Sequence, residues 1–139
     1  MKRKLDIVGV IFLAVAVFLI TGLFVLFPVC GPMDDGSFMK CHWTGRALIG
    51  SGIISAALAV VHLLINDAKA KGAVALAQTF LGIYNIALVT FIIGLCKMET
   101  MQCVAVTKPS VIVISIVLIA VGIFRAVRNL KSGKVSDEK

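Results

Sequence analysis

Four long apolar runs dominate the pattern of hydrophobic and polar positions along this chain. They cover residues 7–27, 47–65, 72–95 and 109–124, and none of them contains an Asp, Glu, Lys or Arg. A membrane-spanning helix needs about 20 mainly apolar residues, so the first three runs qualify outright. The fourth is shorter, but Arg125 can extend its side chain to the interface and so lengthen the span. The pattern predicts an all-α membrane protein with four transmembrane helices in an up-down bundle.

We expect one transmembrane domain, residues 1–127, followed by a charged cytoplasmic tail, residues 128–139. The four predicted helices are about 5–27, 45–66, 72–95 and 109–127. The two predicted outer loops are 28–44 and 96–108. Pro28 ends the first helix because proline has no backbone N–H to donate. The first run is longer than a signal-peptide core of about 7–15 residues, and no small-residue cleavage pattern follows it, so we interpret it as a retained helix.

Composition agrees with a membrane protein. The chain has 139 residues, of which 60% are hydrophobic, and its mean hydropathy is +1.05, whereas a soluble domain is about half apolar. The net charge is +7, but the charges lie at the ends of the apolar runs and form no basic face interleaved with aromatic residues. We therefore expect a lipid bilayer as the partner of this surface, and no nucleic acid.

The distribution of Lys and Arg predicts the orientation. Ten of the 14 basic residues fall on the side that holds both termini, and four fall on the side of the outer loops. Because cytoplasmic segments carry the excess of Lys and Arg, both the N- and C-termini are expected in the cytoplasm. The predicted localisation is the plasma membrane, as a multi-pass protein of the bacterial inner membrane.

Polar residues recur inside the second and third runs. Ser55 and His62 lie seven positions apart, which places them on one helix face, and Gln78 and Asn85 repeat this spacing. The short inner loop makes these helices antiparallel neighbours, so residues at equal distances from Ala70 share a depth. Unpaired polar groups are costly in lipid. We expect an intramembrane polar seam with two bonded pairs, Ser55–Asn85 and His62–Gln78.

Sulfur-containing residues are confined to one side. All four cysteines, and all methionines except the initiator, fall in the predicted outer loops. An even number of cysteines in an oxidising compartment indicates disulfides, and four cysteines allow three connectivities. Local pairing, Cys30–Cys41 and Cys96–Cys103, would close each loop. Cross-loop pairing would instead tie the two hairpins together.

A redox role is an alternative. A four-helix bundle with a cysteine pair in each outer loop resembles the quinone-linked disulfide-generating membrane proteins of bacteria. That resemblance implies a quinone cofactor and thiol–disulfide exchange through Cys30, Cys41, Cys96 and Cys103. The chain departs from that family because neither pair has the Cys-x-x-Cys spacing.

Soft-metal binding at the outer face is a further alternative. Thiol and thioether ligands select copper(I), and an imidazole can join them. The candidate copper ligands are Met39, Cys41, His42, Met98 and Met101. No paired Cys-x-x-Cys or His-x-x-x-His spacing is present, so zinc has less support.

The segment Met39-Lys40-Cys41-His42-Trp43-Thr44 is the most chemically varied stretch between two apolar runs. Its tryptophan is expected to anchor the second helix at the outer interface. Together with the basic start, the proline after the first helix and the nearby Cys30, this segment makes the chain resemble an uncharacterised family of short bacterial and archaeal membrane proteins marked by this motif. The resemblance implies four helices, a domain of unknown function, and an association with transporter permeases.

The leading prediction is a non-enzymatic accessory or interaction subunit of a transporter-type membrane complex, with a disulfide-stapled outer cap. Its expected partner is a permease or a second copy of the chain, and it requires no cofactor. No nucleotide-binding loop, hydrolase motif or pair of intramembrane carboxylates occurs in the sequence. Thiol oxidoreduction with a quinone and copper binding remain the two alternatives.

Overall fold

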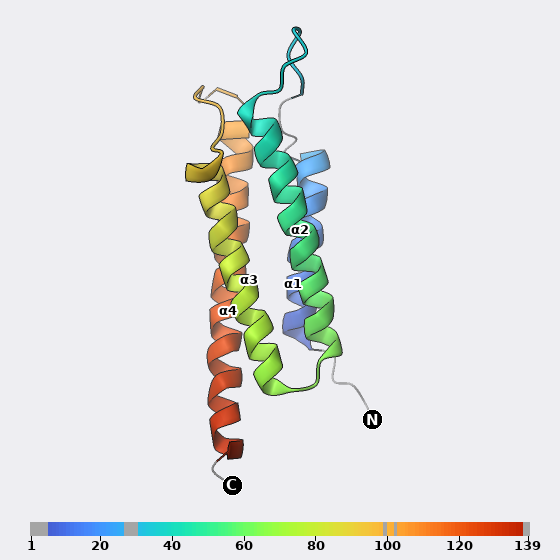
Figure 1. Ribbon diagram of the computed structural model, residues 1–139, viewed down its shortest axis with the longest axis vertical. Helices are drawn as coiled ribbons and strands as arrows, with labels where there is room; N and C mark the ends of the chain where they lie inside the picture. The colour runs from blue at the N-terminus through green and yellow to red at the C-terminus, as the bar shows by residue number, and fades with distance from the viewer. Residues whose placement is uncertain (1–5, 27–30, 99, 102, 138–139) are drawn as a thin grey trace.

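The computed structural model describes residues 6–26, 31–98, 100–101 and 103–137, with side chains described as far as Lys131. Its main elements are four long antiparallel helices (Figure 1). They are α1 (Ile7–Thr21), α2 (Lys40–Leu64), α3 (Ala68–Ala87) and α4 (Lys108–Asp137). Within the described residues, four helical spans are long and apolar enough to cross a membrane. The predicted all-α fold of four transmembrane helices is confirmed.

The start of α1 and the end of α4 lie at the same end of the bundle, which we call the terminal end (Figure 1). The opposite end, the loop end, holds three π-helical segments. η1 (Gly22–Leu26) continues α1, η2 (Leu88–Ile92) continues α3, and η3 (Cys103–Thr107) leads into α4. Such wide turns interrupt regular helical bonding and are frequent at functional sites. The irregular backbone of this bundle is therefore concentrated where the two long loops attach.

Some helix ends differ from those predicted, two of them at polar segments. α2 begins at Lys40, five residues before the predicted start at 45, so most of the hexapeptide is helical. α4 continues to Asp137, well past the predicted end at 127. Both predictions equated the end of an apolar run with the end of a helix. Polarity marks where a helix leaves the membrane, whereas a helix continues until proline, glycine or a cap ends it.

The helices form two closely packed pairs, α1 with α2 and α3 with α4, joined mainly through α2 and α3. Glycines allow the α3–α4 approach. A Cβ on Gly82 would lie 3.0 Å from the carbonyl oxygen of Ser115, and one on Gly122 would collide with Thr79 and lie 2.9 Å from the carbonyl oxygen of Ala75. Small residues at such positions are how helices associate in lipid, where the hydrophobic effect between helices is weak.

The core changes character along the bundle. At the loop end it is built from large aliphatic side chains: Leu19, Leu23, Leu48, Leu88, Val89, Val111 and Ile114. Toward the terminal end three of the five buried apolar residues are alanines: Phe12, Ala59, Ala75, Leu118 and Ala126. The terminal half therefore leaves more of its interior to polar side chains.

An ion cluster closes the terminal end. The carboxylate of Asp6, just before α1, accepts a hydrogen bond from Lys71 of α3 at 2.7 Å and from Arg125 of α4 at 2.6 Å. Burial alone would raise the pKa of Asp6, but the hydrogen bonds and charges of Lys71 and Arg125 outweigh it and hold that pKa below its ordinary value. One carboxylate thus joins three helices.

Candidate functional site

Three thiols converge at the loop end. The Sγ atoms of Cys41, Cys96 and Cys103 all lie within 4.8 Å of one another. The thiol of Cys96 donates a hydrogen bond to Cys41 Sγ at 3.4 Å, and it lies 3.8 Å from the thioether sulfur of Met39. We call these four residues the sulfur cluster. They come from the start of α2, from the segment after η2 and from the start of η3.

Local structure explains this convergence. Cys41 and Cys103 each lie at the start of a helical segment on the face that points into the bundle, and both side chains are 0% exposed. Cys96 follows Gly94, whose positive φ of 72° turns the chain after η2. The hydroxyl of Thr44 donates to the Gly94 carbonyl at 2.7 Å, which ties this turn to α2. The turn brings Cys96 beside Cys41.

A sequence signal for the site was missed. Each hairpin carries Met-x-Cys shortly before or within its second helical segment: Met39-Lys40-Cys41 and Met101-Gln102-Cys103. In addition, a cysteine follows the first apolar run of each hairpin, Cys30 in one and Cys96 in the other. The two hairpins therefore share one pattern of sulfur residues. Comparing the hairpins, rather than the spacing within each loop, would have related Cys41 to Cys103.

The cluster offers a compact set of soft ligands. Metal–thiolate bonds are about 2.3 Å long, so thiolates arranged in a plane around one ion lie about 4 Å apart. The observed sulfur separations, all within 4.8 Å, need only small side-chain movements to reach this arrangement. Cys41 and Cys103 are buried, while Cys96 is partly exposed. The site can therefore be reached through Cys96 and Met39.

The five predicted copper ligands do not all gather. Met39 and Cys41 belong to the sulfur cluster. His42 is not one of the described metal-binding side chains that gather there. The ring of His42 stacks on Phe38 with centroids 4.3 Å apart and meets the edge of Trp43. Met98 is 63% exposed. Met101 contributes its backbone carbonyl, which accepts bonds from Val104 and Ala105.

The disulfide pairing stays a prediction. Cys30 lies outside the described residues, so the local Cys30–Cys41 pair has no structural description. Cys96 lies within reach of both Cys103, its local partner, and Cys41, its cross-loop partner. Cys41 and Cys96 are 3.4 Å apart, well beyond the S–S bond length of about 2.05 Å, so they form a hydrogen bond in this structure.

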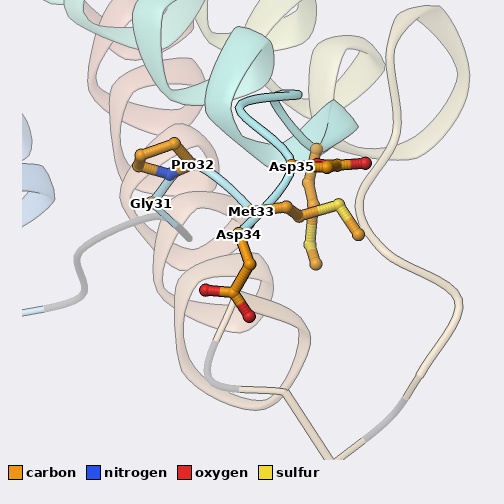
Figure 2. Close-up of a pocket in the computed structure, with 6 residues that line it drawn as sticks. Gly31, Pro32, Met33, Asp34 and Asp35 are labelled. Atoms are coloured by element: carbon orange, nitrogen blue, oxygen red, sulfur yellow. The ribbon is translucent and has the colours of Figure 1, made fainter.

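A shallow open hollow of about 500 Å³ lies on the first loop (Figure 2). It is lined by Gly31, Pro32, Met33, Asp34, Asp35 and Met39. Ser37 donates its hydroxyl and its backbone N–H to Asp35 at 2.8 and 3.1 Å, and these bonds lower the pKa of that carboxyl. Met39 borders the hollow and also contacts Cys96. The hollow thus adjoins the sulfur cluster.

The predicted polar seam lies in the interior, but its predicted pairs are wrong. Ser55 bonds Gln78, and Asn85 accepts a hydrogen bond from Ser51 at 2.6 Å. Gln78 also donates to the carbonyl oxygen of Ser55 at 2.8 Å. The predicted pairs assumed a hairpin centred on Ala70, whereas α2 ends at Leu64 and α3 begins at Ala68. The earlier turn shifts each partner by one to two helical turns: Asn85 bonds Ser51 instead of Ser55, and Gln78 bonds Ser55 instead of His62.

His62 has a different environment from the one predicted. Its side chain is 0% exposed and packs against the ring of Phe12 in an edge-to-face arrangement, with centroids 5.8 Å apart. Neither ring nitrogen has a hydrogen-bond partner within the described part of the chain. The predicted bond to Gln78 is not formed, because Gln78 bonds Ser55, which lies seven residues before His62 on α2.

Comparison with known protein families gives a match over most of the chain. A family model described as "Domain of unknown function (DUF4418)" matches residues 10–128. This match runs from α1 into α4 and includes all four cysteines. No curated protein and no solved structure matches the chain. The chemistry of the site must therefore be argued from its geometry.

Proposed function

Because the chain belongs to the DUF4418 family, whose description assigns no chemistry, we propose its function from the geometry of the sulfur cluster. It is a small membrane protein that binds one soft metal ion, copper(I), at its loop end. The observation that carries this proposal is the convergence of three thiols, from both hairpins, within 4.8 Å.

The ligand set favours copper(I) over harder ions. Thiolate and thioether sulfur are soft donors, and they select copper(I) among the biologically common metals. Among the described residues, the side chains that gather at this site are three cysteines, with the thioether of Met39 beside them. The group contains no carboxylate and no imidazole. Thiols must lose their protons to bind a metal, so binding releases protons and is favoured by rising pH.

The hollow on the first loop supports a route for the ion. Its thioether residues, Met33 and Met39, are joined by the carboxylates of Asp34 and Asp35. The lowered pKa of Asp35 keeps this group ionised, and a negative surface raises the local concentration of cations. Met39 then leads from the hollow to Cys96.

The cellular setting remains as predicted from the sequence. We propose an accessory subunit of a transporter-type complex in the bacterial inner membrane, which presents the sulfur cluster to a permease or to a second copy. The predicted disulfide-closed cap is the oxidised form of the same cluster. This form does not bind the metal, because a disulfide cannot serve as a thiolate ligand. Affinity purification in mild detergent, with and without copper, tests this role. Recovery of the chain with no other membrane protein and only as a monomer would contradict it.

Thiol oxidoreduction is the second candidate. The contact of 3.4 Å between Cys96 and Cys41 favours it, because the two thiols lie next to each other and one of them is partly exposed. Two thiols would form one disulfide and pass two electrons and two protons to a quinone, which becomes the quinol. Mass spectrometry of the reduced protein after incubation with a quinone decides this. A protein that stays reduced eliminates the oxidoreductase.

Titration with copper(I) against a competing chelator tests the proposed function. The reduced protein is expected to bind one equivalent, and Cys41→Ser and Cys103→Ser to weaken that binding by at least tenfold. His42→Ala is the matched control, since His42 is adjacent in sequence to Cys41 but stacks on Phe38 instead of joining the cluster. Equal affinity in the wild type and Cys103→Ser would contradict the proposal.

A further inference from the structure

Buried polar atoms without partners occur in the interior of the bundle. Within the described residues, both ring nitrogens of His62, the amide nitrogen of Asn85 and the hydroxyl of Ser115 have no hydrogen-bond partner. All three side chains are fully buried. Such groups are costly in the middle of a membrane, where no bulk water compensates them. Their presence together calls for a ligand that both donates and accepts hydrogen bonds.

His62 makes the strongest case. A neutral histidine has one ring nitrogen that donates and one that accepts, and neither requirement is met here. Its ring packs on the ring of Phe12, and a Cβ added at Gly9 would lie 3.2 Å from its Nδ1. The ring is therefore held in place by apolar contacts while its polar atoms are left unsatisfied.

Asn85 is unsatisfied whichever way its amide is oriented. Ser51 bonds to the Asn85 oxygen, which leaves the nitrogen without a partner. Exchanging oxygen and nitrogen lets the nitrogen donate to Ser51, but the oxygen is then unpaired. Gln78 differs, because Ser55 bonds both its oxygen and its nitrogen. The same seam thus contains one satisfied amide and one that needs a further partner.

These groups lie in the interior from the middle of the bundle toward the terminal end. Positions 51 and 62 are 11 residues apart on α2, which is about 16 Å of helix at 1.5 Å per residue. Beyond Asn85 the large aliphatic residues Leu48, Leu88 and Val111 fill the core. This column of polar groups is therefore closed toward the loop end.

Polar groups continue from His62 to the terminal end. The charged groups that act on His62 are Asp6 before α1, Lys71 of α3 and Arg125 of α4. Arg125 Nε and the Asn129 side-chain nitrogen are also buried without partners among the described residues. Asp6 and Lys71 retain some exposure, at 10% and 18% of their side chains. The ion cluster is thus the point where the column meets solvent.

We propose that bound water molecules occupy the interior of the bundle between Asn85, near its middle, and His62, and that this water carries protons to His62 from the terminal end. Water both donates and accepts hydrogen bonds, and a buried water with two to four polar partners is a stable part of a structure. The aliphatic core at the loop end stops protons from crossing. The site is independent of the sulfur cluster and of copper.

Solid-state NMR of the full-length protein in lipid bilayers tests the water site. Magnetisation transfer from water is expected to reach the side chains of Asn85 and His62 severalfold faster than the side chains of Leu48 and Val111. Leu48 and Val111 are the internal controls, because they belong to the aliphatic core that closes the column. Transfer to Asn85 and His62 no faster than to these two residues means a dry interior and overturns the proposal.

Two variants test the connection. His62→Phe keeps an aromatic ring but removes both nitrogens, and transfer to Asn85 is expected to fall because the row of waters that leads to Asn85 loses a hydrogen-bonding partner. Unchanged transfer in a folded His62→Phe protein overturns this connection. If this variant fails to fold, Asn85→Leu serves instead. There His62 is expected to stay hydrated from the terminal end, and loss of its water signal overturns that access.

Proton access has its own readout. The ring 15N shifts of His62 are expected to follow the pH of the buffer between about pH 4 and 9, since histidine charges in this range when protons reach it. Within the described residues, the charged groups that interact electrostatically with this ring are Asp6, Lys71 and Arg125. Shifts that stay constant over this range overturn proton access.

Discussion

At the scale of single residues, Asp6 shows how one side chain organises the terminal end. Its carboxylate lies just outside the first span and receives hydrogen bonds from two cations that belong to two other helices. The side chain is only 10% exposed, so these bonds are shielded from water and are stronger than a surface ion pair. The carboxylate therefore contributes both to stability and to the environment of His62.

We predict that Asp6→Asn lowers the free energy of unfolding by about 2 kcal/mol, the order of a charge-assisted hydrogen bond that is lost within a partly buried cluster. The measurement is reversible unfolding in mixed micelles. Asp34→Asn is the matched control, because Asp34 lies in an exposed loop and should change stability by less than about 0.5 kcal/mol. Equal effects of the two substitutions would show that the ion cluster does not stabilise the fold.

The same residue predicts a pH dependence. The folded pKa of Asp6 is below its ordinary value, so its stabilisation is fully present above the unfolded pKa of about 3.9. It is lost as the pH falls through the folded pKa. Melting temperatures of wild type and Asp6→Asn should thus differ at pH 7 and converge as the pH falls below the folded pKa of Asp6. A difference that persists or grows in acid would contradict this assignment.

At the scale of elements, glycine positions set how closely the helices approach. Gly122 of α4 packs on Thr79 and on the backbone of Ala75, with no room for a methyl group. By contrast, nothing lies within 4 Å of a Cβ added at Gly50 of α2. The two glycines therefore separate the effect of packing from the effect of helix propensity.

We predict that Gly122→Ala destabilises the bundle by about 1–3 kcal/mol, because the added methyl group forces α3 and α4 apart. Gly50→Ala should be neutral or stabilise by up to about 1 kcal/mol, because alanine favours a helix and meets no neighbour. Thermal unfolding of both variants in the same detergent gives the comparison. Destabilisation of equal size at both positions would argue against close α3–α4 packing.

The sequence was informative about elements to the extent that apolar runs report contact with lipid. Run length predicted four spans, and the seven-residue spacing predicted that Ser55 and Gln78 point inward. Their bonding partners were not predictable, because a partner depends on where the chain turns between α2 and α3 and on how the helices cross. The early start of α2 was missed for a related reason: Lys40 is polar, but nothing in Lys40–Thr44 ends a helix.

At the scale of the whole molecule, the two ends of the bundle are chemically different. The terminal end carries the ion cluster, and the loop end carries the thiols. The sequence predicts that all cysteines lie near one end, because they flank the apolar runs. Their contact does not, because it requires the Gly94 turn and the bond from Thr44 to bring the second loop onto α2. The hairpin-to-hairpin likeness of Met-x-Cys was the nearest available signal.

The charge asymmetry predicts which end faces the cytoplasm. Ten of the 14 basic residues belong to the terminal side of the chain, so reporter enzymes fused to either terminus should be active only in the cytoplasm. A reporter inserted after Gly36, at the tip of the first loop, should be active only outside. Activity of the terminal fusions on the outer side would reverse the orientation and place the sulfur cluster in a reducing compartment.

The most direct measurement of the central claim is X-ray absorption at the copper edge of the reduced, copper(I)-loaded protein in lipid or detergent. The account predicts a copper(I) spectrum with only sulfur neighbours, three thiolates with or without the thioether of Met39, and loss of this signature in Cys103→Ser but not in His42→Ala. A first shell dominated by nitrogen or oxygen, or a spectrum unchanged in Cys103→Ser, would contradict the sulfur cluster as a copper site.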